Sequence, residues 1–280
     1  YNSGYVYKFG AGNGTLTGNW NVNTYNINYT LNNGTRHMDL FPNKAKFGFT
    51  LAEVLITLGI IGIVAAMTIP TLMSKIQKLQ IESQIKENYS SIVQAMKMGE
   101  NDDVEDVSIS SNAESLKHWF DTFLAPYFKV EAFCVHESGC WHKKGAVKTL
   151  NNLTPTYETD VGNNEANIGW NAVTFRTAKG AYFDLDWTGS ANTKKLFGID
   201  SNNTTLQFYF DVNGDRRPNI IGKDIFILVY DKDKGFLPAG HDRTKEEVKD
   251  NCFNGNGYWC LEYIRANGWT IPEQVWKRKK

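Results

Sequence analysis

The chain has 280 residues with 30 basic and 30 acidic side chains, so its formal net charge at neutral pH is zero. The chain therefore lacks the strongly basic composition that is typical of nucleic-acid-binding proteins. Its net charge also gives no general attraction to anionic membranes. The length allows one large domain or two small ones, and abundant Asn, Gly, Thr and Tyr with only 7 prolines favour a turn-rich, β-containing domain outside the cytoplasm.

Residues 1–37 are polar, nearly uncharged and rich in Asn, Gly, Thr and Tyr. The alternating stretch NWNVNTYNINYTL, residues 19–31, predicts an edge strand or a hairpin. Such a segment buries little apolar surface on its own, so we expect it to be weakly ordered.

An apolar segment from Phe49 to Met73 carries one charged side chain, Glu53. As a helix that rises roughly 1.5 Å per residue, it is long enough to cross the roughly 30 Å hydrocarbon core of a bilayer. Pro70 is expected to kink this helix or to loosen one backbone hydrogen bond. No A-x-A-like cleavage site of a secretory signal is evident at its end.

The lone carboxylate of Glu53 is unfavourable in a membrane, by about 2.5–3.5 kcal/mol near a helix centre and by less near its end. One interpretation places it at the interface of an ordinary signal anchor. The other is that it needs a cation in the apolar phase, such as an α-amino group freed by cleavage between Gly48 and Phe49. The amine of a neighbouring subunit, shifted along the helix axis, would then pair with Glu53 and set the register between packed helices.

Beyond Pro70 the pattern becomes amphipathic, with Lys and Glu on much of the other face. Apolar side chains recur every three or four positions at Leu72, Ile76 and Leu79 and then at Ile81, Ile85, Tyr89, Ile92 and Met96. This spacing predicts one long helix over 49–98, with its first half (49–73) in lipid and its second half packed by one face on a globular domain.

The stretch KFGFTLAEVLI, residues 46–56, resembles the cleavage and methylation motif of type IV pilins and type II secretion pseudopilins. In that family a dedicated prepilin peptidase cuts after the glycine and methylates the new N-terminal phenylalanine, and the glutamate is the fifth residue after the cut. The resemblance implies that Gly48 is the last leader residue, Phe49 the mature N-terminus and Glu53 the assembly carboxylate. Pro70 also matches the family's helix-kinking proline.

The resemblance bears on the start of the chain as well. Family leaders are short and basic, and residues 38–48 (MDLFPNKAKFG) would form such a leader with Lys44 and Lys46. We therefore expect translation to start at Met38, and residues 1–37 to be a non-native or disordered upstream extension.

Residues 99–280 are predicted to form a periplasmic or extracellular globular head. After an acidic linker over 99–110, a Ser111-x-x-Glu114 capping box predicts a helix that Pro126 stops. Its expected buried face is Leu116, Trp119, Phe120, Phe123 and Leu124.

Between about 165 and 230 the pattern changes to period two, and four strands are predicted at AVTFRTA, AYFDLDW, LQFYFDV and DIFILVY. A short helix is predicted near 244–251 with Thr244-x-x-Glu247 as its cap. Another helical turn follows and is closed by Asn267-Gly268, and the final KRKK is expected to be solvated.

Asp211, Asn213 and Asp215 alternate around a glycine turn, a spacing that can wrap oxygens around Ca²⁺. Gly222 stands where an EF-hand has its bidentate glutamate, so an EF-hand is excluded, and Asp224 would close the site instead. The alternative is an Asn-Gly hairpin turn with solvated acids. The family resemblance adds that major pseudopilins bind calcium in a C-terminal loop.

The four cysteines form two pairs that are close in sequence, Cys134 with Cys140 and Cys252 with Cys260. In an oxidising compartment they are interpreted as two short-loop disulfides, although exchanged pairing between the two sets stays open. By resemblance, the second pair matches the disulfide-bounded C-terminal region of type IV pilins.

Other chemistry has weaker support. The Cys134-x-His136-x₃-Cys140-x-His142 segment has zinc-ligand residue types at a non-standard spacing. Asp184 and Asp186 face the same way on a strand, as a glycosidase pair would, and tryptophans near turns could form a sugar platform. No phosphate loop, nucleophile elbow or metalloprotease motif is present, so we expect no enzyme activity.

The sequence therefore predicts an α+β fold in which a long N-terminal helix, transmembrane in its first half, packs on an antiparallel sheet in a pilin-like head. By resemblance it is a structural subunit of a type IV pilus or type II secretion pseudopilus, held in the inner membrane before assembly and in a periplasmic or extracellular filament afterwards. Its expected partners are the prepilin peptidase, other pilin or pseudopilin subunits, the inner-membrane assembly platform and the membrane itself, with no specific nucleic acid evident. The alternatives are a minor or tip pilin that binds DNA, glycan or secreted substrate, and a calcium-dependent periplasmic enzyme on an uncleaved anchor.

Overall fold

The computed structural model describes the backbone of residues 5–8, 15–21, 24–31 and 34–38, together with residues 50–101, 108–110, 112–135, 137–155 and 173–278. The chain divides into two compact units, Tyr1–Thr68 and Ile69–Lys280. The predicted leader residues after Met38, including Gly48, and the predicted mature N-terminus Phe49 lie outside the described residues.

The first unit contains a four-stranded antiparallel sheet in the order β1-β2-β3-β4. Its strands are β1 (Tyr5–Lys8), β2 (Thr15–Asn21), β3 (Thr24–Leu31) and β4 (Gly34–Met38). Strands β2 and β3 pair as a hairpin over the alternating stretch in which the sequence predicts one. The hypothesis that translation starts at Met38 stays a prediction.

Helix α1 (Leu51–Asn101) runs without interruption through Pro70, so the predicted long helix is confirmed with slightly later ends. It is the one helix in the described part of the chain that is long and apolar enough to cross a membrane. The predicted packing face begins later than the spacing indicates. Leu72, Ile76 and Leu79 are exposed, and the buried apolar face of the helix starts near Ile81.

Helix α2 (Ala113–Phe123) follows the linker, and its capping differs from the prediction. Its N-cap is Asn112, whose Oδ1 accepts a hydrogen bond from the Ser115 amide at 2.7 Å, so the predicted Ser111-x-x-Glu114 box is wrong. An Asn side chain is short enough to accept this bond, and it serves as well as serine. The apolar face is buried as predicted.

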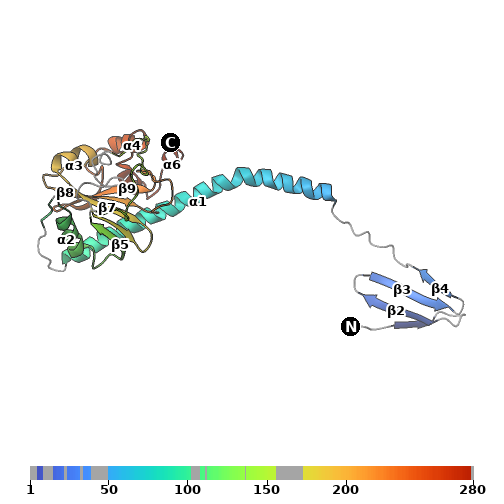
Figure 1. The fold of residues 1–280 in the computed structure, drawn as a ribbon. Helices are drawn as coiled ribbons and strands as arrows, with labels where there is room; N and C mark the ends of the chain where they lie inside the picture. Colours follow the sequence, from blue (N-terminus) through green and yellow to red (C-terminus); the bar gives the residue numbers. More distant parts are fainter. Residues whose placement is uncertain are drawn as a thin grey trace. The chain divides into compact units, whose positions relative to one another are not determined.

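The head is built on a six-stranded antiparallel sheet in the order β10-β9-β8-β7-β6-β5, which confirms the α+β class (Figure 1). The four predicted strands are β6 (Val173–Thr177), β7 (Tyr182–Thr188), β8 (Thr205–Asp211) and β9 (Ile225–Asp231). Two edge strands were not predicted, β5 (Val130–Val135) and β10 (Gly235–Pro238).

Both faces of this sheet are covered. On β9, Phe226, Leu228 and Tyr230 face the core that contains α1 and α2. The alternate residues of β9 face a second core with α3 (Ser190–Phe197), on the other side of the sheet (Figure 1). Burial on both faces explains why IFILVY is continuously apolar rather than alternating.

The C-terminal part consists of α4 (Lys245–Phe253), α5 (Cys260–Ala266) and α6 (Glu273–Trp276). Helix α4 begins with the predicted Thr244–Glu247 capping box. The prediction of a solvated KRKK end is wrong for Arg278, because its guanidinium donates to backbone carbonyls of Phe253, Asn254 and Gly255. Lys279 and Lys280 lie outside the described residues.

Candidate functional site

The start of α1 is closed by a reciprocal pair of side chains. The Thr50 amide and the Thr50 hydroxyl both donate to Glu53 Oε2 at 2.8 Å, and the Glu53 amide donates to Thr50 Oγ1 at 3.2 Å. This is a capping box, which satisfies amide groups that the first helical turn leaves without partners. Thr50-x-x-Glu53 has the same pattern as the box predicted at Thr244, so the signal was present in the sequence and was missed.

The capping box gives Glu53 an intrachain partner before any other subunit arrives. The carboxylate also lies beside the positive end of the helix dipole, which favours a negative charge there. The sequence interpretations placed Glu53 either at the membrane interface or beside a neighbour's amine, and neither included a partner in its own chain. Because Gly48 and Phe49 lie outside the described residues, that intersubunit pair stays a prediction.

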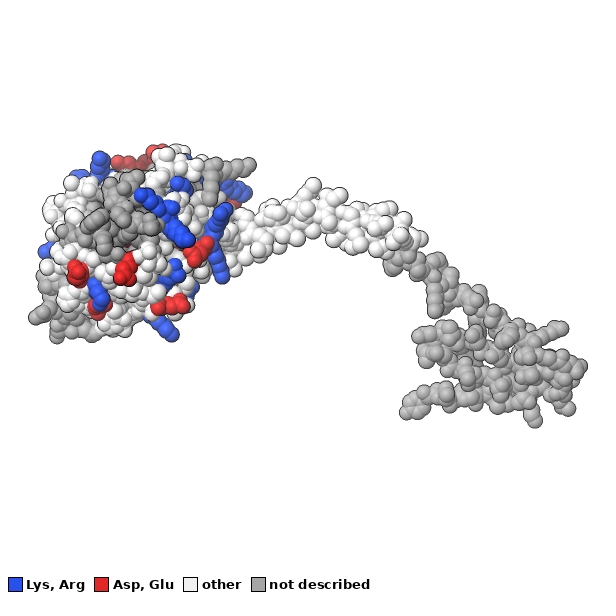
Figure 2. Space-filling view, in the orientation of Figure 1, with Lys and Arg blue, Asp and Glu red and all other residues white. Residues whose placement is uncertain are grey.

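Between Glu53 and Lys75, α1 has no charged side chain. Large apolar side chains such as Leu55, Ile60 and Ile63 are 57–61% exposed, and the apolar window of the helix has no buried residue. In Figure 2 the described atoms of this stretch are white, and the blue and red charged groups lie on the head. Thr57 and Thr68 donate to backbone carbonyls of their own helix, so their hydroxyls are satisfied within the apolar segment.

Pro70 lies inside α1 as the sequence indicates. It has no amide hydrogen, so the carbonyl four residues earlier lacks its usual helical donor. The helix nevertheless continues on both sides of Pro70 in the described structure.

Two of the four predicted calcium ligands are buried carboxylates that already accept hydrogen bonds from other groups of the protein. Asp211 Oδ2 lies 2.7 Å from His142 Nε2, and Asp211 Oδ1 accepts from the amides of Asn213 and Gly214 at 2.8 and 2.9 Å. Asp224 accepts from the amides of Asn219 and Ile220 at 2.8 and 2.7 Å.

The other two predicted ligands are also engaged. Asp215 Oδ2 accepts the Tyr182 hydroxyl at 2.7 Å. The Asn213 side chain, with its amide nitrogen placed to satisfy both neighbours, donates to Asp211 Oδ1 at 2.9 Å and to the Arg216 carbonyl at 2.8 Å. In this orientation it presents a donor, rather than an oxygen, to Asp211.

Burial shifts the pKa of both buried carboxylates of this cluster. Burial raises the pKa of Asp224 well above its ordinary value, and the neighbouring Asp211 charge raises it further. Burial also raises the pKa of Asp211, while the hydrogen bond and charge of His142 lower it. The sequence did not connect His142 with Asp211, because no local spacing relates them.

The predicted calcium site stays a prediction, and these contacts bear on it. Ca²⁺ takes six to eight oxygens, roughly, at close range. Here the three predicted carboxylates already accept N–H or O–H donors, and no three His, Cys, Asp or Glu groups in the described ranges are gathered to hold an ion. The expected Asn-Gly turn is present, but its acids are partnered rather than solvated.

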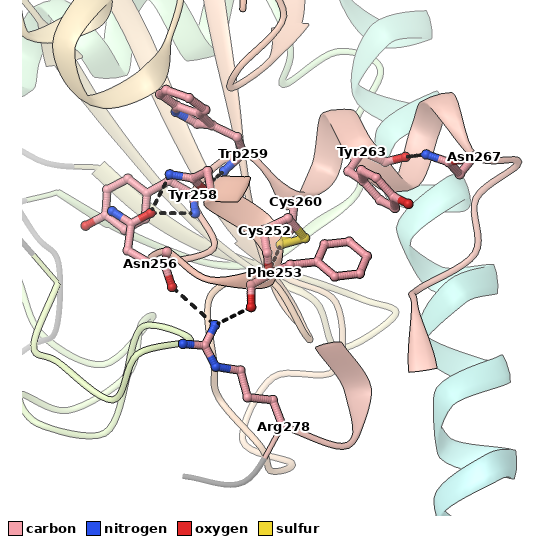
Figure 3. Close-up of a disulfide and its surroundings, with 11 residues drawn as sticks. Cys252, Phe253, Asn256, Tyr258, Trp259, Cys260, Tyr263, Asn267 and Arg278 are labelled. Carbon is pink, nitrogen blue, oxygen red and sulfur yellow. Dashed lines mark hydrogen bonds between the residues drawn. A yellow bond between two sulfur atoms is a disulfide. The ribbon is translucent and has the colours of Figure 1, made fainter. Parts of the chain in front are cut away.

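The predicted disulfides Cys134–Cys140 and Cys252–Cys260 are both present, with Cα separations of 5.9 and 4.7 Å, so exchanged pairing is not found. The second joins α4 to α5 inside the C-terminal part, next to the carbonyl of Phe253 that receives Arg278 (Figure 3). Because both sulfurs of the first pair are bonded to each other, the zinc alternative at Cys134 is wrong. His136 lies outside the described residues.

Asp184 and Asp186 share one face of β7 as predicted, but they are only 1% and 7% exposed. Burial raises the pKa of Asp186 to about 7, against a smaller lowering by the Trp187 amide. A pair this deeply buried is poorly placed to reach a sugar substrate, so the glycosidase alternative gains no support.

Comparison with known proteins gives one match. Residues 43–69 match the family model of the prokaryotic N-terminal methylation motif, the signature of type IV pilins and pseudopilins. The match contains Gly48, Phe49 and Glu53 and ends one residue before Pro70. Neither a curated protein nor a solved structure matches the chain.

Proposed function

We propose that this chain is the precursor of a structural subunit of a type IV pilus or a type II secretion pseudopilus. The observation that carries the proposal is the methylation motif at residues 43–69, which coincides with the start of an apolar helix joined to an α+β head. The motif implies a structural role rather than catalysis.

Processing would begin at the junction before α1. A prepilin peptidase would cut between Gly48 and Phe49 and methylate the new amine. The cut removes the charged leader and leaves a mature chain with a new N-terminal amine and with Glu53 as the single charged side chain before Lys75.

Assembly would then use the exposed apolar stretch of α1. Fully burying one Leu or Ile side chain is worth about 1.5–3 kcal/mol relative to water, so this stretch must remain in lipid or against other helices. Moving it from the bilayer into a filament exchanges lipid contacts for helix packing, which polar pairs can direct.

Glu53 would direct that packing. In the precursor its carboxylate is held by Thr50, and in the filament the N-terminal amine of a neighbouring Phe49 would join or replace this cap. An unpaired charge in an apolar interior is strongly destabilising, so only the register that pairs the two groups would be stable.

The proposal places the chain in the inner membrane, as a single span, until the assembly platform draws it into a periplasmic or extracellular filament. Its partners would be the peptidase, that platform and other subunits contacted through α1. N-terminal sequencing and intact mass of the assembled protein test the first step. We expect N-methylated Phe49, and an N-terminus upstream of it would contradict the cleavage.

A second candidate function is a minor or tip subunit that binds an external ligand. The head carries a groove of about 570 Å³ lined by Arg176, Tyr182 and Arg216 among others. The Arg176 guanidinium carbon lies 4.3 Å from the centroid of the Tyr182 ring, an arrangement able to receive an anionic group of DNA, glycan or secreted protein. Copy number in sheared filaments separates the two, since a tip subunit would be rare.

A further inference from the structure

The last helix of the head returns to α1 and forms a groove with it. Trp276 Nε1 donates to Ser74 Oγ at 2.9 Å. The groove has a volume of about 520 Å³, and its walls are Pro70, Thr71, Ser74 and Lys75 of α1 with Glu273, Trp276 and Lys277 of the C-terminal segment.

This C-terminal segment is held in place from several sides. Ile271 and Val275 are fully buried in the main core. Lys78 Nζ lies 2.8 Å from Glu273 Oε1, and Lys223 Nζ donates to the carbonyls of Trp276 and Arg278 at 3.0 and 2.7 Å. The C-terminal segment that forms one wall of the groove therefore has a fixed position on the head.

The position of the groove along α1 matches the edge of a bilayer. Leu72 and Met73 are the last apolar residues before Lys75 and are 57% and 59% exposed. Lys75 is the first charged residue after Glu53. Trp276 is half-buried and carries its polar N–H beside Ser74, and tryptophans of this amphipathic kind are enriched where membrane meets water.

One cation of the groove has no ion-pair partner, and the other has only an exposed one. Among the described residues, no carboxylate lies within ion-pair distance of Lys75. Lys277 Nζ lies 3.1 Å from Glu273 Oε2, but both side chains are exposed, at 75% and 57%, so their pairing contributes little. The exposed hydroxyl of Thr71 adds a neutral donor beside them.

We propose that this groove binds the phosphate of an anionic phospholipid in the leaflet that faces the head. Lys75 and Lys277 contact the phosphate, and Trp276 with Pro70 lies against the glycerol and upper acyl region. Phosphate attracts lysine near a membrane surface, and a lipid already occupies this depth wherever the helix spans a bilayer. The inference rests on the membrane-anchored form in the proposed function, but it does not require filament assembly.

Bound lipid would set how deep the precursor lies in the membrane. Leaving the bilayer would then require release of this lipid, so the groove would tie the head to the membrane surface until assembly.

The test uses the full chain in mild detergent with equimolar phosphatidylglycerol and phosphatidylcholine, and native mass spectrometry reads the retained lipid. We expect phosphatidylglycerol to be retained preferentially. The double variant Lys75→Gln/Lys277→Gln should lose this preference by roughly tenfold or more, since each lysine near an anionic surface is worth about fivefold in affinity. Both side chains are exposed, so the head should melt as the wild type does.

The matched control is Lys194→Gln/Lys195→Gln on α3, which packs on the opposite face of the sheet from the core that contains α1. It should retain phosphatidylglycerol like the wild type. Equal retention of the two lipids by the wild type, or unchanged retention by the groove variant, would overturn the proposal. Displacement of the lipid by millimolar inorganic phosphate would also overturn it, because it would show a free-anion site.

Resistance of the chain to carbonate extraction from membranes separates this inference from the proposed function. A chain that is inserted but shows no lipid preference defeats the inference alone. A chain that prefers the anionic lipid but forms no filament defeats the proposed function alone.

Discussion

Thr50 and Glu53 cap α1 reciprocally, with the Thr50 amide and hydroxyl both 2.8 Å from Glu53 Oε2. The carboxylate that the methylation motif places in the apolar segment therefore has a partner within its own chain. Thr50 holds this carboxylate in place for a neighbour's amine to join, so assembly should depend on both residues.

Glu53→Val should insert in the membrane and be processed, but it should assemble poorly because the neighbour's amine has no counter-charge. Thr50→Val removes only the hydroxyl of the cap, at a cost of about 0.5–2 kcal/mol, and should weaken assembly less. The yield of sheared filaments per unit of processed protein measures the assembly of both variants. Thr57→Val is the matched control, since the Thr57 hydroxyl only contacts a carbonyl of its own helix. Normal filaments from Glu53→Val would refute the pairing.

His142→Ala should destabilise the head by about 1–3 kcal/mol, because it leaves one oxygen of the buried Asp211 carboxylate without its hydrogen-bond partner. Denaturant unfolding of the full chain in detergent, followed by tryptophan fluorescence, measures the change. His118→Ala on the exposed side of α2 is the control and should change the free energy of unfolding little. A loss below about 1 kcal/mol for His142→Ala would show that the two backbone donors alone satisfy Asp211.

Asp186→Asn should flatten the pH dependence of stability. The pKa of Asp186 is raised from 3.8 to about 7 in the folded chain, so the folded state keeps a proton that the unfolded state loses. Its stabilising contribution is present at low pH and decreases as pH rises from about 4 to about 7. At pH 8 the free energy of unfolding of the variant should therefore be higher than that of the wild type, by on the order of 1–3 kcal/mol.

Thermal melting at pH 4, 6 and 8 checks this prediction for Asp186. The exposed Asp121→Asn variant should follow the wild type at each pH. If the melting temperatures of Asp186→Asn and the wild type differ equally at all three values, the proton is not retained.

Calcium binding by Asp211, Asn213, Asp215 and Asp224 stays a prediction of the sequence that the contacts do not favour. Because the oxygens of the three carboxylates already accept protein donors, we expect neither Ca²⁺ nor a chelator to shift the melting temperature. A calcium-dependent rise that Asp211→Asn abolishes would restore the calcium hypothesis.

Local signals predicted local structure well in this chain. Propensity and spacing were sufficient to find features that involve only residues close in sequence. These are the Thr244 capping box, the apolar run of β9 and the two disulfide pairs. The short edge strands were missed because four to six residues carry too little periodicity. Leu72, Ile76 and Leu79 were assigned to the packing face because spacing shows a stripe but not where its partner surface begins.

By itself, the sequence determined the processing motif, the apolar helix with its single carboxylate, and the α+β class of the head. Each of these follows from neighbouring residues and from the periods of helix and strand. Only the tertiary structure decided that His142 meets Asp211 across 69 positions and that Trp276 meets Ser74 across 202. Those contacts depend on how the sheet is covered on both faces and where α6 docks, and no local spacing encodes them.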